Sequence, residues 1–140
     1  MSCRRLLITN NPFLSKNISC TLPVEGTSLD VLRLSRDHVH GGWALLSSPL
    51  YGNLRPHQHP YRSVLIEKSE SQPGGVDLLS LELIENALLI YTSQEFSLLS
   101  PEGMPEEVRE DFACIDAELM KETLERYRLF PRQGMVKRCL

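Results

Sequence analysis

The sequence contains no long hydrophobic run and no excess of basic residues. Its longest apolar stretch, from Ala87 to Tyr91, is far shorter than the roughly 20 residues that a membrane-spanning helix needs. We therefore expect no insertion into a membrane. Lysine and arginine number 15 against 18 aspartates and glutamates, for a formal net charge of −3. Because this balance offers no basic surface to a phosphate backbone, we expect no nucleic-acid partner.

Motifs of secretion, nucleotide binding and nucleophilic catalysis are also missing. The first apolar run, Leu6 to Ile8, is too short for a signal peptide, which needs roughly seven to fifteen apolar residues. There is no G-x-G-x-x-G, no G-x-x-x-x-G-K-[ST] and no G-x-S-x-G. The cysteines lie far apart without a C-x-x-C pair; they are Cys3, Cys20, Cys114 and Cys139. We interpret them as free thiols of a cytoplasmic protein.

What is present is the composition of an ordinary globular protein. The chain has 140 residues, of which 41% are hydrophobic and 24% are charged. These fractions exclude a disordered or a fibrous chain. The length suits one hydrophobic core, so we expect a single domain over residues 1–140.

Three segments have strand-like patterns. Arg5 to Thr9 turns from charged to apolar and stops at Asn10-Asn11-Pro12, which predicts an interior strand followed by a sharp turn. Ile18 to Val24 alternates weakly and contains Pro23, so we expect an edge strand or a loop there. Tyr61 to Glu67 alternates and carries three consecutive aliphatic residues, which predicts another strand.

The segment from Thr27 to Gly42 fits two structures. Thr27 and Asp30 have the spacing of a helix capping box, whereas residues 29–34 alternate as a strand does. We favour a strand over Asp30 to Leu34, followed by a short helix. Ser35 would cap this helix and Gly41-Gly42 would end it.

Two long helices are predicted in the second half of the chain. The first covers residues 77–93 and begins at Asp77 as its N-cap. Its apolar residues at helical spacing are Leu81, Ile84, Leu88 and Tyr91, widened by Leu83, Ala87 and Ile90. Because this stripe is wide, we expect the helix to be well buried or to form the contact of a homodimer.

The second long helix is predicted over residues 105–129, with Pro105 at a first-turn position. The apolar stripe that we expect to face its core consists of Val108, Phe112, Ile115, Leu119 and Tyr127. Strands therefore concentrate in the first half and long helices in the second. This order indicates an α/β fold in which helices pack on a small mixed sheet.

Polar residues concentrate between positions 36 and 62, and this segment holds all four histidines. They form two H-x-H pairs, His38 with His40 and His57 with His59. In an extended chain, residues two apart point to the same side, so each pair could offer two imidazoles to one metal ion. On a helix the members of a pair diverge. The simpler alternative is that His57 and His59 are loop residues and that His38 or His40 packs against Trp43.

The same segment offers a second chemistry, the binding of an anion. Arg36, Arg55 and Arg62 could converge on a carboxylate or a phosphate, with His40 as an acid–base group if the protein is an enzyme. The alternative for Arg36 is an exposed charge pair with Asp37, which is the commoner arrangement on protein surfaces.

Several runs of this chain resemble the GrdX family. They are residues 8–12, 36–42, 45–56, 60–65 and 80–85, and the resemblance extends over about residues 5 to 90. GrdX proteins are small cytoplasmic bacterial proteins encoded beside the glycine, sarcosine and betaine reductase machinery. The resemblance therefore implies a bacterial cytoplasmic protein linked to glycine reductase metabolism. Gly42 and Ser48 replace histidines of the family pattern, which weakens the metal hypothesis.

Together, the residues and the resemblance favour a non-enzymatic accessory protein that binds a ligand or a partner. The partner would be a protein of the reductase system or a small anionic metabolite, and no cofactor is indicated. The residues expected to form the binding surface are Asn10, Asn11, Arg36, Asp37, His40, Arg55, Tyr61 and Arg62. The alternatives are a small enzyme that acts on an anionic metabolite through His40, and a metal-binding protein that uses the histidine pairs.

Overall fold

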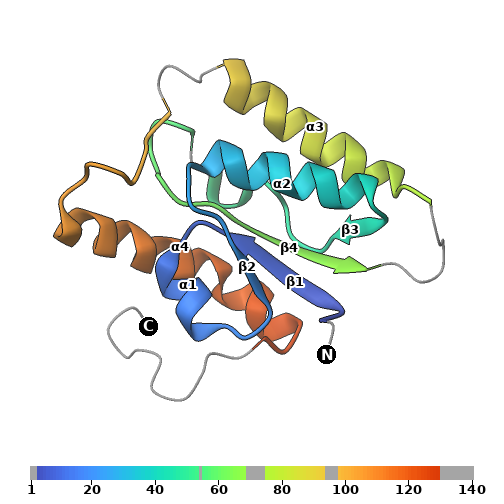
Figure 1. Cartoon of the computed structure of the whole chain (residues 1–140), viewed down its shortest axis with the longest axis horizontal. Coiled ribbons are helices and arrows are strands. Elements are labelled where there is room, and N and C mark those ends of the chain that lie inside the picture. The colour runs from blue at the N-terminus through green and yellow to red at the C-terminus, as the bar shows by residue number, and fades with distance from the viewer. Residues whose placement is uncertain (1–2, 54, 69–74, 94–97, 130–140) are drawn as a thin grey trace.

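A mixed four-stranded sheet lies between two layers of helices in the computed structural model, which describes residues 3–53, 55–68, 75–93 and 98–129 (Figure 1). The strands are β1 (Arg5–Thr9), β2 (Thr21–Pro23), β3 (Trp43–Leu45) and β4 (Ser63–Lys68), in the order β2-β1-β4-β3. Strand β1 is parallel to β2, and β4 is antiparallel to both of its neighbours. The predicted α/β fold with a small mixed sheet is confirmed.

Helices cover both faces of this sheet. Helices α2 (Ser28–His40) and α3 (Leu78–Ser93) pack on one face, and α1 (Pro12–Asn17) and α4 (Glu106–Arg126) pack on the other (Figure 1). A short 3-10 turn, Tyr51–Asn53, lies in the connection between β3 and β4. In the described part of the chain, none of the helices combines the length and the apolarity that crossing a membrane requires.

The two central strands supply the core of both layers. Ile8, Val64 and Ile66 pack toward α2 and α3, whereas Leu7 and Leu65 pack toward α1 and α4; all five are fully buried. This division follows from the alternation of side chains along a strand. Because helices cover both faces, β4 has the nearly continuous apolar pattern of a central strand.

The predicted strands lie at or close to their expected positions. Strand β1 has the expected bounds, and β2 forms an edge of the sheet with Pro23 as its last residue. The apolar run from Trp43 forms the other edge, β3. The turn after β1 is more than a turn, since Asn11 caps helix α1 by accepting a hydrogen bond from the Phe13 N–H.

The strand predicted over Asp30 to Leu34 is wrong, because α2 is continuous through it. The capping box decides between the two patterns: Asp30 accepts a hydrogen bond from the Thr27 N–H at 2.9 Å, and its own N–H donates to the Thr27 hydroxyl. Ser35 is not a cap, since its hydroxyl bonds to a carbonyl within the helix. Gly41 ends the helix as predicted, and Gly42 follows with a φ of 99°.

Helix α3 has nearly the predicted bounds, and Asp77 accepts a hydrogen bond from the Ser80 N–H at its start. The expectation that it is well buried holds for one face only. Ile84, Ala87, Leu88 and Tyr91 are buried among α2 and the sheet. Leu83 and Ile90, which were expected to widen the buried stripe, are 40% and 41% exposed.

The buried face of α4 is also different from the predicted one. Val108, Ile115 and Leu119 of the predicted stripe are exposed by 38%, 48% and 39%, whereas Phe112 contacts the buried His59 and Tyr127 packs against the core. The buried residues are Ala113, Asp116, Ala117, Met120 and Leu124. The helix turns this face inward because alanines allow close packing on α1 and the sheet, and because Asp116 finds hydrogen-bond partners there.

The prediction of free thiols is wrong. Cys3 and Cys20 form a disulfide with a Cα–Cα distance of 6.0 Å, which lies in the usual range. It connects the chain before β1 to the loop between α1 and β2. Cys114 is disulfide-bonded as well, so none of the described cysteines is a free thiol.

Candidate functional site

The most polar part of the interior surrounds Asp116 of α4, which is 1% exposed. Its carboxylate accepts hydrogen bonds from the Tyr51 hydroxyl, from Nδ2 of Asn11 at 3.0 Å and from the Ser63 hydroxyl at 2.9 Å. These donors come from the 3-10 turn, from the cap of α1 and from the first residue of β4. One carboxylate therefore connects three segments that are far apart in the sequence.

The hydroxyl groups next to Asp116 have a fixed direction of donation. Ser63 gives its proton to Asp116, so the 2.7 Å contact between Thr9 and Ser63 is a hydrogen bond that Thr9 donates. The Thr9 hydroxyl in turn accepts from the backbone N–H of Asn11 at 3.0 Å. We call this set the Asp116 network; its members are Thr9, Asn11, Tyr51, Ser63 and Asp116.

Tyr51 remains a donor in this network. Burial raises the pKa of its hydroxyl well above the usual value, and the negative charge of Asp116 raises it further. The hydroxyl accepts a hydrogen bond from the Ser63 N–H at 2.8 Å while it donates to Asp116. Tyr51 thus stays protonated at neutral pH and joins the start of β4 to α4.

Arg62 lies inside the protein, beside this network, at 1% exposure. Its guanidinium donates to the Tyr51 carbonyl at 3.0 Å and to the Tyr91 hydroxyl at 2.7 Å. The same group lies 4.6 Å from the centre of the Tyr51 ring and 5.6 Å from that of Tyr91. Arg62 therefore joins the β3–β4 connection to α3 and does not reach the surface.

The side chain of Asn10 also makes its hydrogen bonds inside the protein. Its Nδ2 donates to the carbonyls of Gly26 and Pro60 at 3.1 and 2.9 Å, and its Oδ1 accepts from the Arg62 N–H at 2.8 Å. The structure thus brings Asn10, Asn11 and Arg62 together, as expected for one site. Their polar groups, however, hold protein segments to one another instead of facing a ligand.

The pair His57 and His59 is divided between surface and interior. His57 is exposed, whereas His59 is 2% exposed and meets the ring of Phe112 edge to face at 5.0 Å. Nδ1 of His59 accepts a hydrogen bond from the Tyr61 N–H at 3.1 Å. Burial lowers the pKa of His59, so that its ring is neutral at physiological pH.

The pair His38 and His40 lies on α2, where residues two apart diverge around the helix. His38 packs edge to face against Trp43, with ring centres 5.7 Å apart, as the simpler alternative predicted. Asp37 and His40 are exposed, and Arg36 lies 3.8 Å from Glu85 of α3 in an exposed ion pair.

The two histidine pairs lie at opposite ends of β4. His59 comes shortly before Ser63, the first residue of this strand, whereas His40 comes shortly before Trp43, which pairs with the last residue, Lys68. The pairs therefore do not share a metal ion. Among the residues that the structure describes, no three histidine, cysteine, aspartate or glutamate side chains gather as metal ligands.

Arg55 does not approach Arg36 either. It is exposed in a tight turn, where its N–H donates to the Gln58 side chain at 2.8 Å. The next residue, Pro56, accepts a hydrogen bond from Leu99, which follows the C-terminal end of α3. Arg36 and His40 lie instead in the second half of α2, toward the end of the sheet where α3 begins. At that end, Ser80 of α3 accepts a hydrogen bond from the Leu45 N–H of β3. The predicted binding surface over residues 36–62 is therefore split between two separate parts of the molecule.

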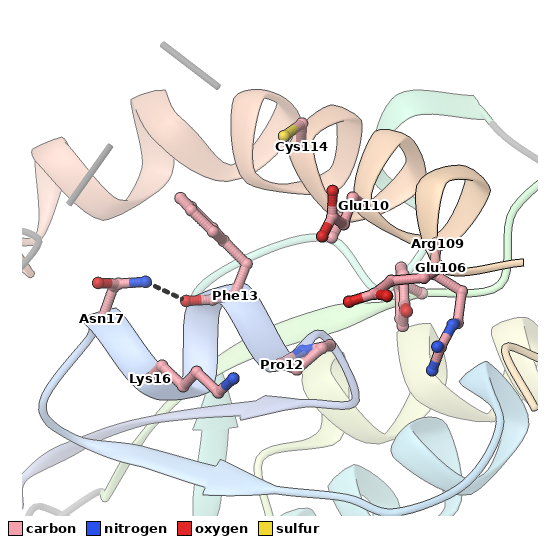
Figure 2. A pocket seen from close by; sticks show the side chains of 10 residues that line it. Pro12, Phe13, Lys16, Asn17, Glu106, Arg109, Glu110 and Cys114 are labelled. Carbon is pink, nitrogen blue, oxygen red and sulfur yellow. Dashed lines mark hydrogen bonds between the residues drawn. The ribbon is translucent and has the colours of Figure 1, made fainter. Parts of the chain in front are cut away.

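A cleft of about 460 Å³ opens between α1 and the first half of α4 (Figure 2). From α1 it is lined by Pro12, Phe13, Lys16 and Asn17, and from α4 by Glu106, Arg109, Glu110, Ala113 and Cys114. Tyr61 is the one sequence-predicted binding residue that lines it. Phe13 and Lys16 extend from α1, and Glu106, Arg109 and Glu110 extend from α4, so charged groups lie on both walls.

Tyr61 combines an apolar ring with a protonated hydroxyl in this cleft. The residue is 4% exposed, and burial raises the pKa of its hydroxyl. The positive charge of Arg109, which lines the same cleft, opposes part of this rise. The cleft thus offers aromatic contact from Phe13 and Tyr61 beside the charges of its walls.

The side chain of Asn11 holds the two walls of the cleft together. Its Oδ1 accepts from the Phe13 N–H at the start of α1, and its Nδ2 donates to the Ala113 carbonyl of α4 at 2.9 Å and to Asp116. Asn11 is fully buried, so these bonds are shielded from water. The Asp116 network therefore fixes the geometry of the cleft from behind.

Sequence reasoning missed the charged residues of the cleft, Lys16, Glu106, Arg109 and Glu110. A signal for one wall was present, because an Asn-Pro pair is typical of an N-cap and the first position of a helix. For α4, the positions 106, 109, 110 and 113 share one face at helical spacing. The apolar residues on the opposite side of α4 concealed this signal.

The comparisons with known proteins give one match. The family model described as "GrdX-like protein" matches residues 6–125 of the chain, which include β1 from its second residue, the other three strands and most of α4. No curated protein and no solved structure matches the chain.

Proposed function

Since this chain belongs to the GrdX-like protein family, we propose that it is a non-enzymatic accessory protein of amino-acid reductase metabolism, with glycine reductase as the first candidate system. It acts by binding, and the cleft between α1 and α4 is its ligand site. The side chain of Asn11 carries this proposal, because it bonds to both walls at once. A site held in its binding geometry loses little conformational freedom when a ligand enters.

The chemistry of the cleft supports a small charged ligand. Its volume of about 460 Å³ lies within the usual range of small-molecule sites. Lys16 and Arg109 would bind an anionic group, while Glu106 on the same cleft favours a ligand that also carries a cationic group. An amino acid has both groups, so a zwitterionic metabolite suits these walls best.

Binding without catalysis is supported by the state of Tyr61, because burial raises the pKa of its hydroxyl and holds it in the protonated form. We therefore assign Tyr61 to the shape of the cleft. A protein of the reductase system would receive or deliver the ligand, and the exposed first turns of α4 are the surface beside the cleft where it would dock.

The family also supports a bacterial cytoplasmic location. Because the cytoplasm keeps most thiols reduced, this location requires the pair Cys3 and Cys20 to exist there mainly as a dithiol. Alkylation of cell lysates, followed by mass spectrometry of the two peptides, measures the reduced fraction. A largely oxidised pair in intact cells would contradict the cytoplasmic assignment.

The ligand proposal is tested by calorimetric titration with four probes: glycine, glycine betaine, acetate and methylammonium. We expect the two zwitterions to bind more tightly than acetate, and methylammonium to bind most weakly. Arg109→Ala should weaken the binding of glycine by about tenfold or more, since it removes a charge-assisted contact. The matched control is Arg126→Ala on the same helix, where Arg126 pairs with Glu122 at 3.2 Å.

Each result of this titration has a definite meaning. Equal glycine affinity in the native protein and in Arg109→Ala would remove the cleft as the site. An equal loss in Arg109→Ala and Arg126→Ala would show a general effect of charge. If none of the four probes binds, the small-ligand proposal fails and capture of a reductase component becomes the next test.

A further inference from the structure

The outer surface of α3 is unusually apolar for a surface helix. This helix lies on the outside of α2, with one flank against it (Figure 1). The large apolar side chains exposed on it are Leu78, Leu79, Leu83, Leu89 and Ile90, with exposures of 75%, 65%, 40%, 69% and 41%. Contiguous exposed apolar patches of this kind mark interaction sites in soluble proteins.

The patch has an apolar pair at each end of the helix, with Leu83 and polar residues between them. Leu78 and Leu79 begin the helix, and Leu89 and Ile90 come three helical turns later, about 16 Å along the axis and on the same side. Glu82 and Asn86 lie between these ends on the exposed face. The pattern reads nearly the same in both directions about Ile84, at the middle of the helix; the exception is Leu83, whose counterpart is Glu85.

From this symmetry we propose that a second copy of the chain binds to this face, with the two α3 helices antiparallel across a two-fold axis near Ile84. In an interface with two-fold symmetry, every contact occurs twice. If one residue of the first copy contacts another residue of the second copy, the same two residues also meet with the copies exchanged. Leu78 and Leu79 of one copy then cover Leu89 and Ile90 of the other, and this contact occurs twice. Both apolar ends are buried in one step.

Charge favours the antiparallel orientation over the parallel one. Helix α3 carries Glu82 and Glu85 and no basic residue, and Glu85 is already paired with Arg36 of its own chain at 3.8 Å. The antiparallel arrangement places Glu82 opposite Asn86 of the second copy, whose amide can donate to it. A parallel arrangement would place Glu82 opposite Glu82. The antiparallel helix dipoles also attract one another.

This inference is independent of the ligand cleft, which lies on the opposite face of the sheet. Sedimentation equilibrium of the full chain at micromolar concentration should give twice the chain mass of 15.9 kDa. Leu79→Glu and Ile90→Glu, tested separately, should each raise the dissociation constant of the dimer at least about tenfold, since the two-fold axis repeats each change. The matched control is Ile115→Glu, at a comparably exposed position of α4 (48%).

A crosslinking experiment tests the orientation without relying on a destabilised interface. Leu79→Cys and Leu89→Cys are prepared separately, one of them with an affinity tag, then mixed and treated with a short bismaleimide. The antiparallel dimer should crosslink the mixture and leave Leu79→Cys alone uncrosslinked at this position. Crosslinking of Leu79→Cys with itself would overturn the proposal.

Three further outcomes would also overturn it. They are a native chain that sediments as a monomer, a Leu79→Glu variant that dimerises as well as the native chain, and an Ile115→Glu variant that is monomeric. A monomer whose α3 face binds a basic amphipathic peptide would assign this face to another protein. Far-ultraviolet circular dichroism of each variant confirms that the changes at exposed positions leave the fold intact.

Discussion

The Asp116 network and the cleft in front of it use polar groups in opposite ways. In the network, the Asn11 side chain, the Tyr51 hydroxyl and the Ser63 hydroxyl all donate to one buried carboxylate. In the cleft, Lys16, Arg109 and Glu106 are exposed and face open space. The buried polar residues therefore fix the positions of the helices, whereas under the proposed function the exposed charges would recognise the ligand.

This comparison separates stability from binding. A change in the network should lower the free energy of unfolding, because buried polar groups lose their partners. A change on the cleft walls should affect ligand affinity and leave stability nearly unaltered, because exposed charges contribute little to it.

Asp116→Ala should have the largest effect. The substitution leaves the three donors of the network without their common acceptor, and each buried unsatisfied group costs roughly 1–3 kcal/mol. We expect the free energy of unfolding to fall by about 4 kcal/mol, measured by urea denaturation. Glu118→Ala, on the exposed side of the same helix, should change it by less than about 0.5 kcal/mol. Similar values for both variants would contradict the fixing role of the network.

Tyr51→Phe should have an intermediate effect. It removes the hydroxyl that donates to Asp116 and accepts from the Ser63 N–H, and it keeps the ring over which Arg62 lies. The expected loss is about 2 kcal/mol in the free energy of unfolding, again from urea denaturation. Tyr127→Phe is the control, because its ring packs on Arg5 at the other end of α4. A loss in Tyr127→Phe as large as that in Tyr51→Phe would show a general sensitivity to tyrosine hydroxyls.

The contribution of His59 to the pH dependence of stability should be smaller than the effects of the two substitutions above. Because burial lowers its pKa in the folded protein, the unfolded chain binds the proton first as the pH falls below about 6.5. Below that pH, His59 lowers the free energy of unfolding by at most about 1.4 kcal/mol per pH unit. Urea denaturation at pH 7.5 and 5.5 should show a smaller difference for His59→Gln than for the native protein. The exposed His57→Gln should keep the native difference; a reversed order of these two variants would refute the assignment.

Arg36→Ala and Arg55→Ala should have the smallest effects. Arg36 makes an exposed ion pair, and Arg55 lies in an exposed turn, so each change should cost less than about 0.5 kcal/mol in stability. Both variants should also bind glycine as the native protein does, since neither residue lines the cleft. Calorimetric titration measures this. Weaker glycine binding in both variants would instead support the anion-binding site of Arg36 and Arg55 that the sequence suggested.

Local signals explain which parts of the fold could be predicted. Pro23 indicates an edge strand, Gly41-Gly42 indicates a helix end, and Asp77 indicates a helix start, and the structure has all three. The strand predicted over residues 30–34 failed because its alternation also fits a helix with one buried face. There the capping box of Thr27 and Asp30 was the stronger signal.

The candidate site could not be predicted, since its geometry depends on contacts between distant segments. Asn11 and Asp116 are 105 positions apart, and nothing near either residue indicates the other. For α4, hydropathy favoured Val108 and Ile115 as core residues over Ala113 and Asp116. Packing reverses this preference. The small side chain of Ala113 permits a close approach of the helix, and the buried Asp116 is tolerated because hydrogen-bond donors surround it.

The edges of the sheet limit how the protein can aggregate. Strands β2 and β3 have three residues each, and β2 ends at Pro23, which has no N–H to offer a new strand. On β3, the outward N–H of Leu45 already donates to the Ser80 hydroxyl of α3 at 2.8 Å. A foreign chain therefore finds only a short and partly blocked template for strand addition, and the apolar β4 stays enclosed. Copies of this protein at high concentration should meet through helices and form bounded assemblies instead of growing fibrils.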